Sequence, residues 1–301
     1  MTIAKTKYEL GRHETFALRE GWLGKGLNRV LTHPEHYKAD LETADELGLG
    51  SRMVKSLAFW LDATNLIDRS AGDARKKGPV PASDLGAAVH EHDPHFEYSI
   101  TNWFMHLMLA RRTGSVWNWF FNDFRNTSFT REACIEEFNR HLREHSINQT
   151  TIGVTQREIG CLLSTYASPP ANEADDPEDV SVSPMRSLSL LIKHHDTSRY
   201  EKTQPLDAIP IEAFLACVAL LAQDSGSETV PLSDLIAQRN SPAKLFNIDG
   251  DRISELAHMA EEIYAKDGVK LSLLGSVRTI TVLQLTPVSL YARHFARLGR
   301  S

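Results

Sequence analysis

The spacing of apolar residues along the chain predicts a protein built mainly of helices, with short extended pieces between them. The segment that begins at Ser51 has the i, i+3, i+4, i+7 spacing of one buried helix face, formed by Val54, Leu57, Ala58 and Leu61. A shorter helix is predicted at residues 43–47, and the sequence GLG at residues 48–50 suits the tight turn between the two helices. A polar stretch with a Gly-Pro break follows. We therefore interpret this region as a winged helix-turn-helix.

The polar face of the longer helix predicts contact with DNA. Arg, Lys and Ser on an outer helix face can enter the major groove, while a mobile basic wing neutralises the phosphates beside it. The predicted DNA-binding residues on the helix, expected to face outward, are Ser51, Arg52, Lys55 and Ser56. Those on the wing are Arg75, Lys76 and Lys77. The alternative is a dimerisation or protein-binding module whose charged face is only solvated.

A second helix-turn-helix is predicted further along the chain. Thr130 is a suitable N-cap for a helix over residues 131–144. The next helix places four residues on one side, namely Ile152, Ile159, Leu163 and Tyr166. Near its start lie side chains of the kinds that read base edges, and the predicted DNA-binding residues here are Gln149, Thr150, Gln156 and Arg157. An ordinary solvated surface explains these four equally well.

Large aromatic residues concentrate between the two predicted units. They are Trp103, Trp117, Trp119, Phe120, Phe121 and Phe124. An aromatic ladder could stack single-stranded bases. The helical spacing and the apolar surroundings favour instead a buried core that joins the two units.

The remaining patterns complete the expected fold. Residues 168–184 are proline-rich and acidic without apolar periodicity, which predicts a linker. The expected fold class is mainly α with short β-wings, as tandem winged helix-turn-helix units plus an α/β C-terminal region. The expected domains are residues 1–98 (the N-terminal motif HETF at residues 13–16 and the winged unit), 99–167 (aromatic block and second helix-turn-helix), 168–184 (acidic linker) and 185–301 (α/β or winged unit).

The composition narrows the class of protein. With 301 residues, 42% hydrophobic and 24% charged, the chain is expected to be a soluble globular protein. Its three cysteines are far apart and predict neither a zinc module nor a disulfide framework, so a cytoplasmic location is expected. The sequence contains no signal-peptide pattern and no apolar run of membrane-spanning length, and no membrane association is expected. The net charge of −6 argues against coating of nucleic acid by bulk charge, so any DNA contact must be local.

Established catalytic motifs are missing from the sequence. It has no P-loop, no GxGxxG, no HExxH, no GxSxG and no kinase signature. The segment VHEHDPHFE, residues 89–97, gathers histidines and acids, but His-x-His is a weak metal signal and the Asp-Pro step favours a solvated turn. The sequence therefore predicts no particular set of metal ligands.

The stretch GRHETFALRE, residues 11–20, carries the residue types that phosphodiester chemistry needs. His13 can act as a general base or acid near neutral pH, and Glu14 can bind a metal ion or orient a water molecule. Arg12 or Arg19 can stabilise the charge of a phosphorane. The alternative is a charged helix entrance, in which Thr15 caps a helix over residues 16–18, Glu14 favours its N-terminal dipole, and Arg19 and Glu20 face solvent.

The same stretch resembles the N-terminal signature of the SspB-like family, whose members are encoded beside bacterial DNA phosphorothioation genes. The matching positions are His13, Glu14, Thr15, Phe16, Leu18, Arg19, Gly21, Trp22, Leu23 and Lys25. Leu10 and Arg12 depart from the signature, so Arg12 is given no family role. The resemblance continues in order through GLGSRMVKSLAFWLDATNLI, WNWFFNDF, FTREACIEEF, REIGCLLSTY and SPAKLFNID.

This resemblance implies a function in phosphorothioation, in which sulfur replaces a non-bridging phosphate oxygen of DNA. Members of the family are described as DNA-nicking endonucleases that act with an ATP-dependent sulfurtransferase and a cysteine desulfurase. We therefore expect a nickase of a phosphorothioation-based defence system that acts on double-stranded DNA, with a divalent metal such as Mg²⁺ as cofactor. The catalytic residues implied are His13, Glu14 and Arg19.

Two alternatives to the nickase stay open at this point. One is a non-catalytic DNA-binding adaptor that recruits the sulfurtransferase, with HETF as a structural clasp. The other is a transcriptional regulator of the same operon. A duplex target and tandem winged units are compatible with a homodimer.

Overall fold

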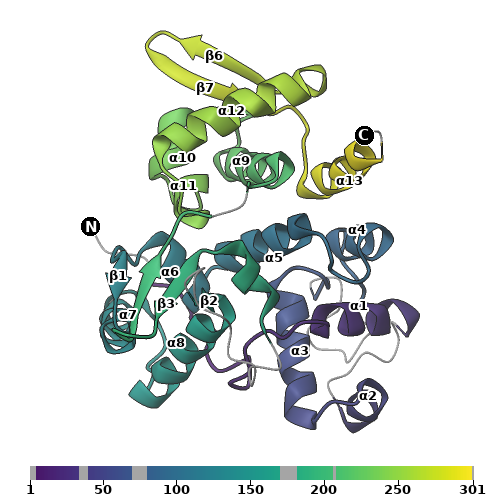
Figure 1. Cartoon of the computed structure of the whole chain (residues 1–301), viewed down its shortest axis with the longest axis vertical. Helices are drawn as coiled ribbons and strands as arrows, with labels where there is room; N and C mark the ends of the chain where they lie inside the picture. Colours follow the sequence, from purple (N-terminus) through teal and green to yellow (C-terminus); the bar gives the residue numbers. More distant parts are fainter. Residues whose placement is uncertain (1–4, 34–39, 70–79, 170–181, 206–207, 300–301) are drawn as a thin grey trace. The chain divides into compact units, whose positions relative to one another are not determined.

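The structure is a computed structural model that describes residues 5–33, 40–69, 80–169, 182–205 and 208–299 (Figure 1). The chain divides into two compact units, residues 1–203 and 204–301. Each unit has its own buried apolar residues, and the fold is mainly helical with small sheets, as predicted. Among the helices of these described ranges, none is both long enough and apolar enough to cross a membrane.

The first unit is a helical assembly with one small sheet. Its helices are α1 (Trp22–Thr32), α2 (Leu41–Leu47), α3 (Ser51–Ala63), α4 (Asp84–His92), α5 (Ser99–Arg111), α6 (Val116–Asn122), α7 (Arg131–His145), α8 (Ile152–Tyr166) and the 3-10 helix η2 (Pro184–Leu188). Its strands are β1 (Ser128–Phe129), β2 (Ala167–Ser168), β3 (Leu191–His194) and β4 (Arg199–Lys202). The sheet order is β1-β4-β3-β2, in which β2 pairs with β3 in parallel and the other two pairs are antiparallel.

The aromatic block forms the core of this unit. All six of its predicted members are buried, each with at most 5% of its surface exposed. Phe120 stacks on Phe124 with ring centroids 5.4 Å apart, and Trp119 lies 4.7 Å from Phe138 of α7. The predicted core role of the aromatic residues is confirmed, because rings enclosed on all sides offer no face to a nucleic acid base.

The predicted first pair of helices is present as α2 and α3. Asp40 accepts a hydrogen bond from the Thr43 amide at the start of α2, and Gly48 ends this helix in the left-handed conformation that glycine tolerates best. The predicted outward orientation of Ser56 is wrong, because its side chain is completely buried. The last two turns of α3 are enclosed on nearly every side, and α1 packs against this helix. The predicted wing residues Arg75, Lys76 and Lys77 lie outside the described residues.

The predicted second pair of helices is present as α7 and α8. Thr130 caps α7 as predicted, since its side chain accepts a hydrogen bond from the amide of Ala133. Ile159, Leu163 and Tyr166 are buried, but Ile152 is 65% exposed because it lies in the first turn of α8. Most of the predicted acidic linker, residues 170–181, lies outside the described part of the chain.

The second unit combines helices with a three-stranded sheet. Its elements in order are α9 (Ile211–Ser225), β5 (Thr229–Pro231), α10 (Leu232–Ala237), α11 (Pro242–Leu245), α12 (Gly250–Tyr264), the 3-10 helix η3 (Ala265–Asp267), β6 (Lys270–Leu274), β7 (Val277–Thr281) and α13 (Pro287–Leu298). The antiparallel sheet has the order β5-β7-β6. The prediction of an α/β C-terminal region agrees with this arrangement.

All three cysteines are free thiols in buried positions. Burial raises the pKa of Cys134 to about 12 and the pKa of Cys161 well above its ordinary value. Cys217 lies in the middle of α9, where it is fully buried. The described structure therefore has no disulfide, in agreement with the spacing of the cysteines.

Candidate functional site

Residues 11–16, which we call the HET loop, form a turn and no helix. The alternative of a helix entrance at Thr15 is therefore wrong, and α1 begins only at Trp22. Two non-glycine residues of the loop have left-handed backbone, Glu14 with φ 51° and Thr15 with φ 72°. A β-branched residue such as Thr rarely adopts a positive φ, because its side chain then crowds the backbone. The loop is thus a strained segment that its surroundings must hold in place.

A buried pair of side chains holds the HET loop on the side that faces the protein interior. His13 and Glu158 of α8 are each 1% exposed, and their Nε2 and Oε1 atoms are 3.1 Å apart. The same Glu158 oxygen accepts a hydrogen bond from the Gly11 amide. His13 Nδ1 accepts from the Thr15 amide at 3.1 Å, so the ring proton lies on Nε2 and is donated to Glu158. We call this set of contacts the clasp.

Aromatic rings surround the clasp on the side of the core. The His13 ring meets those of Phe59 and Trp117 edge to face, with centroids 6.0 Å and 6.1 Å away. At the end of the loop, the Phe16 carbonyl accepts a hydrogen bond from Trp60 Nε1 at 3.2 Å and lies 3.4 Å from the Cys161 thiol. The backbone of the HET loop is therefore fixed at both ends, and His13 points into the protein interior.

The three predicted catalytic side chains do not converge. While His13 is buried, Glu14 is partly exposed and forms an ion pair with Arg52 of α3, with Oε2 and Nε 3.1 Å apart. The Arg19 guanidinium lies over the rings of Phe16 and Trp22 and lines a separate cavity of about 680 Å³. The structure thus brings Glu14 together with a predicted DNA-binding residue and away from the other two.

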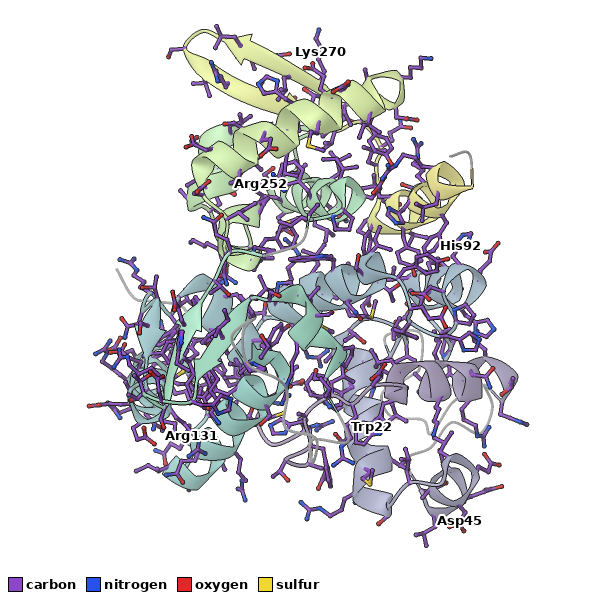
Figure 2. All side chains as sticks on the ribbon, in the orientation of Figure 1. Trp22, Asp45, His92, Arg131, Arg252 and Lys270 are labelled. Carbon is purple, nitrogen blue, oxygen red and sulfur yellow. The ribbon has the colours of Figure 1, made fainter. Side chains whose placement is uncertain are left out.

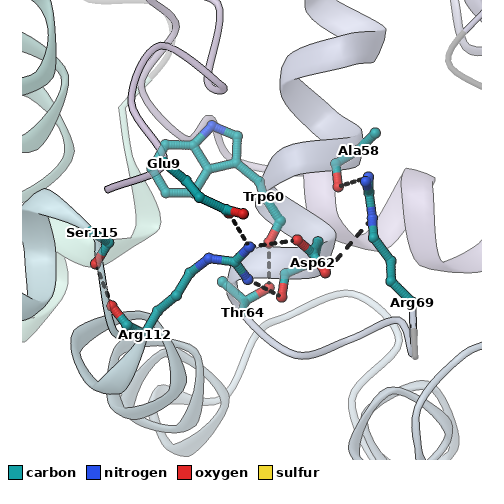
Figure 3. A network of polar contacts seen from close by, with 8 residues as sticks. All are labelled: Glu9, Ala58, Trp60, Asp62, Thr64, Arg69, Arg112 and Ser115. Carbon is teal, nitrogen blue, oxygen red and sulfur yellow. Dashed lines mark hydrogen bonds and ion pairs between the residues drawn. The ribbon is translucent and has the colours of Figure 1, made fainter. Parts of the chain in front are cut away.

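A surface cavity of about 370 Å³ lies beside the HET loop. It is lined by Glu9, Gly11, Arg12, Glu14, Lys55, Ala58, Phe59, Asp62, Arg69 and Arg112. Figure 3 shows the ion-pair network along one wall of this cavity. Arg112 Nη2 lies 2.8 Å from Asp62 and 3.0 Å from Glu9, and Arg69 lies 3.6 Å from the other Asp62 oxygen. This network joins the end of α3 to the segment that precedes the loop.

Two cations on the cavity have no such partner. Arg12 and Lys55 are exposed and form no ion pair or hydrogen bond with the part of the chain that the structure describes. The sequence predicts DNA binding by Lys55, whereas Arg12 departs from the family signature. The structure places both beside Glu14, so the cavity presents free positive charge next to a carboxylate.

The other predicted DNA-binding residues are dispersed. Ser51 is exposed at the start of α3. Gln149, Thr150 and Gln156 line an open cavity of about 900 Å³ between α7 and α8, and Arg157 is exposed on α8 outside it. Their contact with DNA stays a prediction. Ser56, which is buried, cannot reach a ligand in this conformation.

Sequence reasoning missed Glu158, the partner of His13. Its position carries a readable signal, because Glu158 lies on the buried stripe of α8 together with Thr155, Ile159 and Leu162. A carboxylate at such a position is expected to have a buried partner, since an unpaired buried charge is costly. The sequence could therefore have indicated that Glu158 pairs within the core, although not with which residue.

The histidine-rich segment at residues 89–97 has a structural role. Asp93 is buried and accepts hydrogen bonds from the Glu97 and Tyr98 amides and from the Thr101 hydroxyl. These contacts fix the turn between α4 and α5. Within the described residues, no group of three or more His, Cys, Asp or Glu side chains is arranged to hold a metal ion.

Comparison with known proteins places the chain in a family. Residues 10–282 match the model of a family described as "Protein of unknown function (DUF4007)". The magnesium ion-bound SspB crystal structure is similar with a TM-score of 0.79 and 22% identity, over 99% of this chain and 88% of that chain. A second SspB crystal structure is similar with a TM-score of 0.78 and 20% identity, over 99% of this chain and 89% of that chain. No curated protein sequence matches. The chain therefore belongs to the DUF4007 family and has the fold of SspB, which confirms the resemblance predicted from the sequence.

Proposed function

We propose that the chain is a DNA-binding nicking endonuclease of a bacterial phosphorothioation system, and that the HET loop and its cavity hold the DNA backbone. The observation that carries this proposal is the strained loop, in which the clasp holds Glu14 and Thr15 in left-handed backbone. Such strain persists only where the surroundings enforce it, and it concentrates at functional sites. The SspB fold and the matched signature at residues 13–25 support the choice of system.

Phosphate binding is the step that the free cations support best. Arg12 and Lys55 line the cavity from the HET loop and from α3, and both side chains are exposed. A DNA phosphate between them would release bound counterions, which makes local binding favourable even though the whole chain is acidic. Arg52 pairs with Glu14, which lines the cavity, and keeps 64% of its side chain exposed.

A divalent cation such as Mg²⁺, which is bound in one of the similar SspB structures, is the cofactor that we assign to this site. When bound, it would stabilise phosphate charge and activate water. Magnesium in phosphoryl sites commonly takes one or two protein carboxylates together with substrate oxygens. Glu14 fits this requirement, because only its Oε2 is engaged by Arg52. Asp62 does not, because Arg112 and Arg69 engage both of its oxygens.

The burial of His13 assigns it a positioning role in this proposal, since at 1% exposure its ring does not touch substrate. Burial against Phe59 and Trp117 also favours the second candidate function, a non-catalytic DNA-binding adaptor in which HETF is only a structural clasp. In both functions the sulfurtransferase and the desulfurase of the same operon are the protein partners. The two differ in whether the purified chain cuts DNA.

Removal of Arg12 and Lys55 is expected to weaken the binding of DNA to a similar extent whatever the base sequence of that DNA. Affinity for DNA falls as salt rises, and each phosphate that the protein no longer neutralises makes the fall of log affinity with log salt shallower by about 1. The slope of Arg12→Ala/Lys55→Ala is therefore expected to be shallower by about 2. Mobility shifts on a duplex at several salt concentrations measure this slope. Lys266→Ala/Lys270→Ala removes two exposed cations of the second unit and is the matched control, with no change expected. Equal slopes for the two double variants would remove the cavity from DNA binding.

Plasmid relaxation with and without magnesium separates the two candidate functions. The wild type is expected to convert supercoiled plasmid to nicked circles with magnesium, and Glu14→Gln is expected to cut at least about 100-fold more slowly because it lacks the carboxylate. Glu42→Gln, at an exposed acid of α2, is the control that should cut normally. A wild type that shifts DNA without nicking it establishes the adaptor and excludes the nickase.

A further inference from the structure

In the second unit, the order of the elements places helix α12 and the β6–β7 hairpin on one surface. A helix, a strand, two short helices, the longer helix α12 and the hairpin β6–β7 follow one another, and the sheet order is β5-β7-β6. This is the order of a winged helix-turn-helix, in which the long helix before the hairpin enters the major groove and the hairpin contacts phosphates. In a DNA-binding unit of this type, the outer face of α12 and the hairpin tip are expected to carry cations.

The outer face of α12 is instead acidic. Asp251, Glu255 and Glu262 are exposed on it. Its one arginine, Arg252, is half-buried and forms an ion pair with Glu255, with Nη1 and Oε2 2.6 Å apart (labelled in Figure 2). A DNA phosphate backbone would meet like charge along this helix. The face that would read the groove is therefore unsuited to nucleic acid.

The hairpin tip is mainly apolar, with a single exposed cation, Arg278, opposite Leu273. Leu273 is 66% exposed, Leu274 62% and Val277 44%, on either side of the turn at Gly275. On α12, Met259 and Ile263 are each 40% exposed. Apolar side chains grouped in this way mark surfaces that another protein covers, because their transfer out of water stabilises the complex.

The helix and the hairpin are fixed relative to each other within the unit. Strand β6 pairs with β7 along its whole length, and β7 pairs in turn with β5. Glu261 of α12 accepts a hydrogen bond from the Leu271 amide of β6 at 2.8 Å. A partner can therefore meet the acidic helix and the apolar tip together as one preformed surface, without ordering a loop on binding.

We propose that α12 and the β6–β7 hairpin form a protein-docking surface, and that its occupant is a folded protein presenting Lys and Arg side chains around exposed apolar residues. The acidic residues of α12 would face those cations, and Leu273 and Leu274 would enter the apolar part of the partner. Complementary charge of this kind sets the rate and specificity of association, while the apolar contacts carry most of the affinity. The second unit thus recruits a protein, whereas the cavity of the first unit holds DNA.

The choice of probe rests on the proposed function, which names the sulfurtransferase of the same operon as a partner. The full chain is titrated with the purified sulfurtransferase by calorimetry at low and high salt. The apolar variant Leu273→Ser/Leu274→Ser and the charge variant Glu255→Lys/Glu262→Lys are each expected to weaken binding about tenfold or more. The controls are Leu41→Ser, at a 71% exposed leucine of the first unit, and Glu228→Lys, at an exposed acid outside the surface. Both controls are expected to bind like the wild type.

A DNA mobility shift with the apolar variant provides the second readout, and no change is expected. The docking surface is overturned if the wild type does not bind the sulfurtransferase, or if the apolar and charge variants bind it like the wild type. Loss of the DNA shift in the apolar variant would show that the hairpin contacts nucleic acid and would also overturn it. If Arg12→Ala/Lys55→Ala has the same salt slope as its control, only the proposed function is contradicted, because those residues lie in the first unit. Unchanged thermal unfolding of each variant excludes misfolding as the cause.

Discussion

Replacing Glu158 with alanine is expected to lower the free energy of unfolding of the first unit by about 2–5 kcal/mol, the cost of leaving hydrogen-bond donors without their carboxylate acceptor. Glu158 is 1% exposed, and its removal leaves the His13 Nε2–H and the Gly11 amide without an acceptor. The buried His13 donor and the part-buried Gly11 amide then lose their hydrogen bonds, while the strain at Glu14 and Thr15 is no longer opposed. Urea unfolding followed by tryptophan fluorescence measures the change, because Trp117 lies against His13.

Two further variants test the origin of this destabilisation. Glu144→Ala removes a carboxylate that is 59% exposed on α7, and a change below about 0.5 kcal/mol is expected. His13→Ala/Glu158→Ala removes both partners, so its effect is expected to be smaller than the sum of the two single variants. An additive double variant would mean that the two residues stabilise the fold independently and that no clasp exists.

Replacing Glu212 with alanine is expected to destabilise the second unit by a similar amount, about 3–5 kcal/mol. Glu212 of α9 is completely buried and accepts hydrogen bonds from Tyr264 of α12 at 2.6 Å, and from His294 and Arg297 of α13 at 2.8 Å and 2.9 Å. One carboxylate therefore joins three helices. Hydrogen exchange of the amides of α13 reports the destabilisation, and Glu255→Ala, at an exposed acid, is the control. Wild-type exchange in Glu212→Ala would show that packing alone holds α13.

The same carboxylate makes the second unit sensitive to acid. Burial alone raises the pKa of Glu212, but the hydrogen bonds from His294, Arg297 and Tyr264 outweigh it and lower the pKa to about 2, from an ordinary 4.5. Because the folded state has the lower pKa, the stabilisation is complete above pH 4.5 and is lost as the pH falls toward 2. Between pH 6 and pH 3 this group alone is expected to cost about 2 kcal/mol. Urea unfolding at a series of pH values measures the dependence, which is expected to be flatter in Glu212→Gln.

The helices were the predictable part of the fold, because their periodicity is a local property of the sequence. The aromatic block, the Thr130 cap and the turn at Gly48 all follow from residues within a few positions of one another. Ser56 shows where this reasoning stops. Its place in the helical repeat suggests an outer face, but contacts from distant segments enclose α3, and no spacing within the helix reveals them.

The candidate site was predictable in its residue types and not in its geometry. The signature points to His13 and Glu14, yet the local pattern favours a helix there. The left-handed turn depends on Glu158, which lies 145 positions away in the sequence. The cavity likewise combines Arg12 with Lys55, which no sequence motif connects. Contacts of this range decide which side chains face solvent, so His13 is buried and Arg12 becomes available to a ligand.

The three buried cysteines have a practical consequence for labelling. The thiolate is the form that reacts with maleimides, and burial suppresses it by raising the pKa of Cys134 to about 12 and that of Cys161 well above its ordinary value. Cys217 is fully buried as well. A cysteine introduced at an exposed position, such as Ser51 at the start of α3 or Leu273 on the hairpin, would therefore be the fast-reacting thiol of the folded chain. A fluorescent reporter can thus be attached to either unit while the native cysteines remain in place.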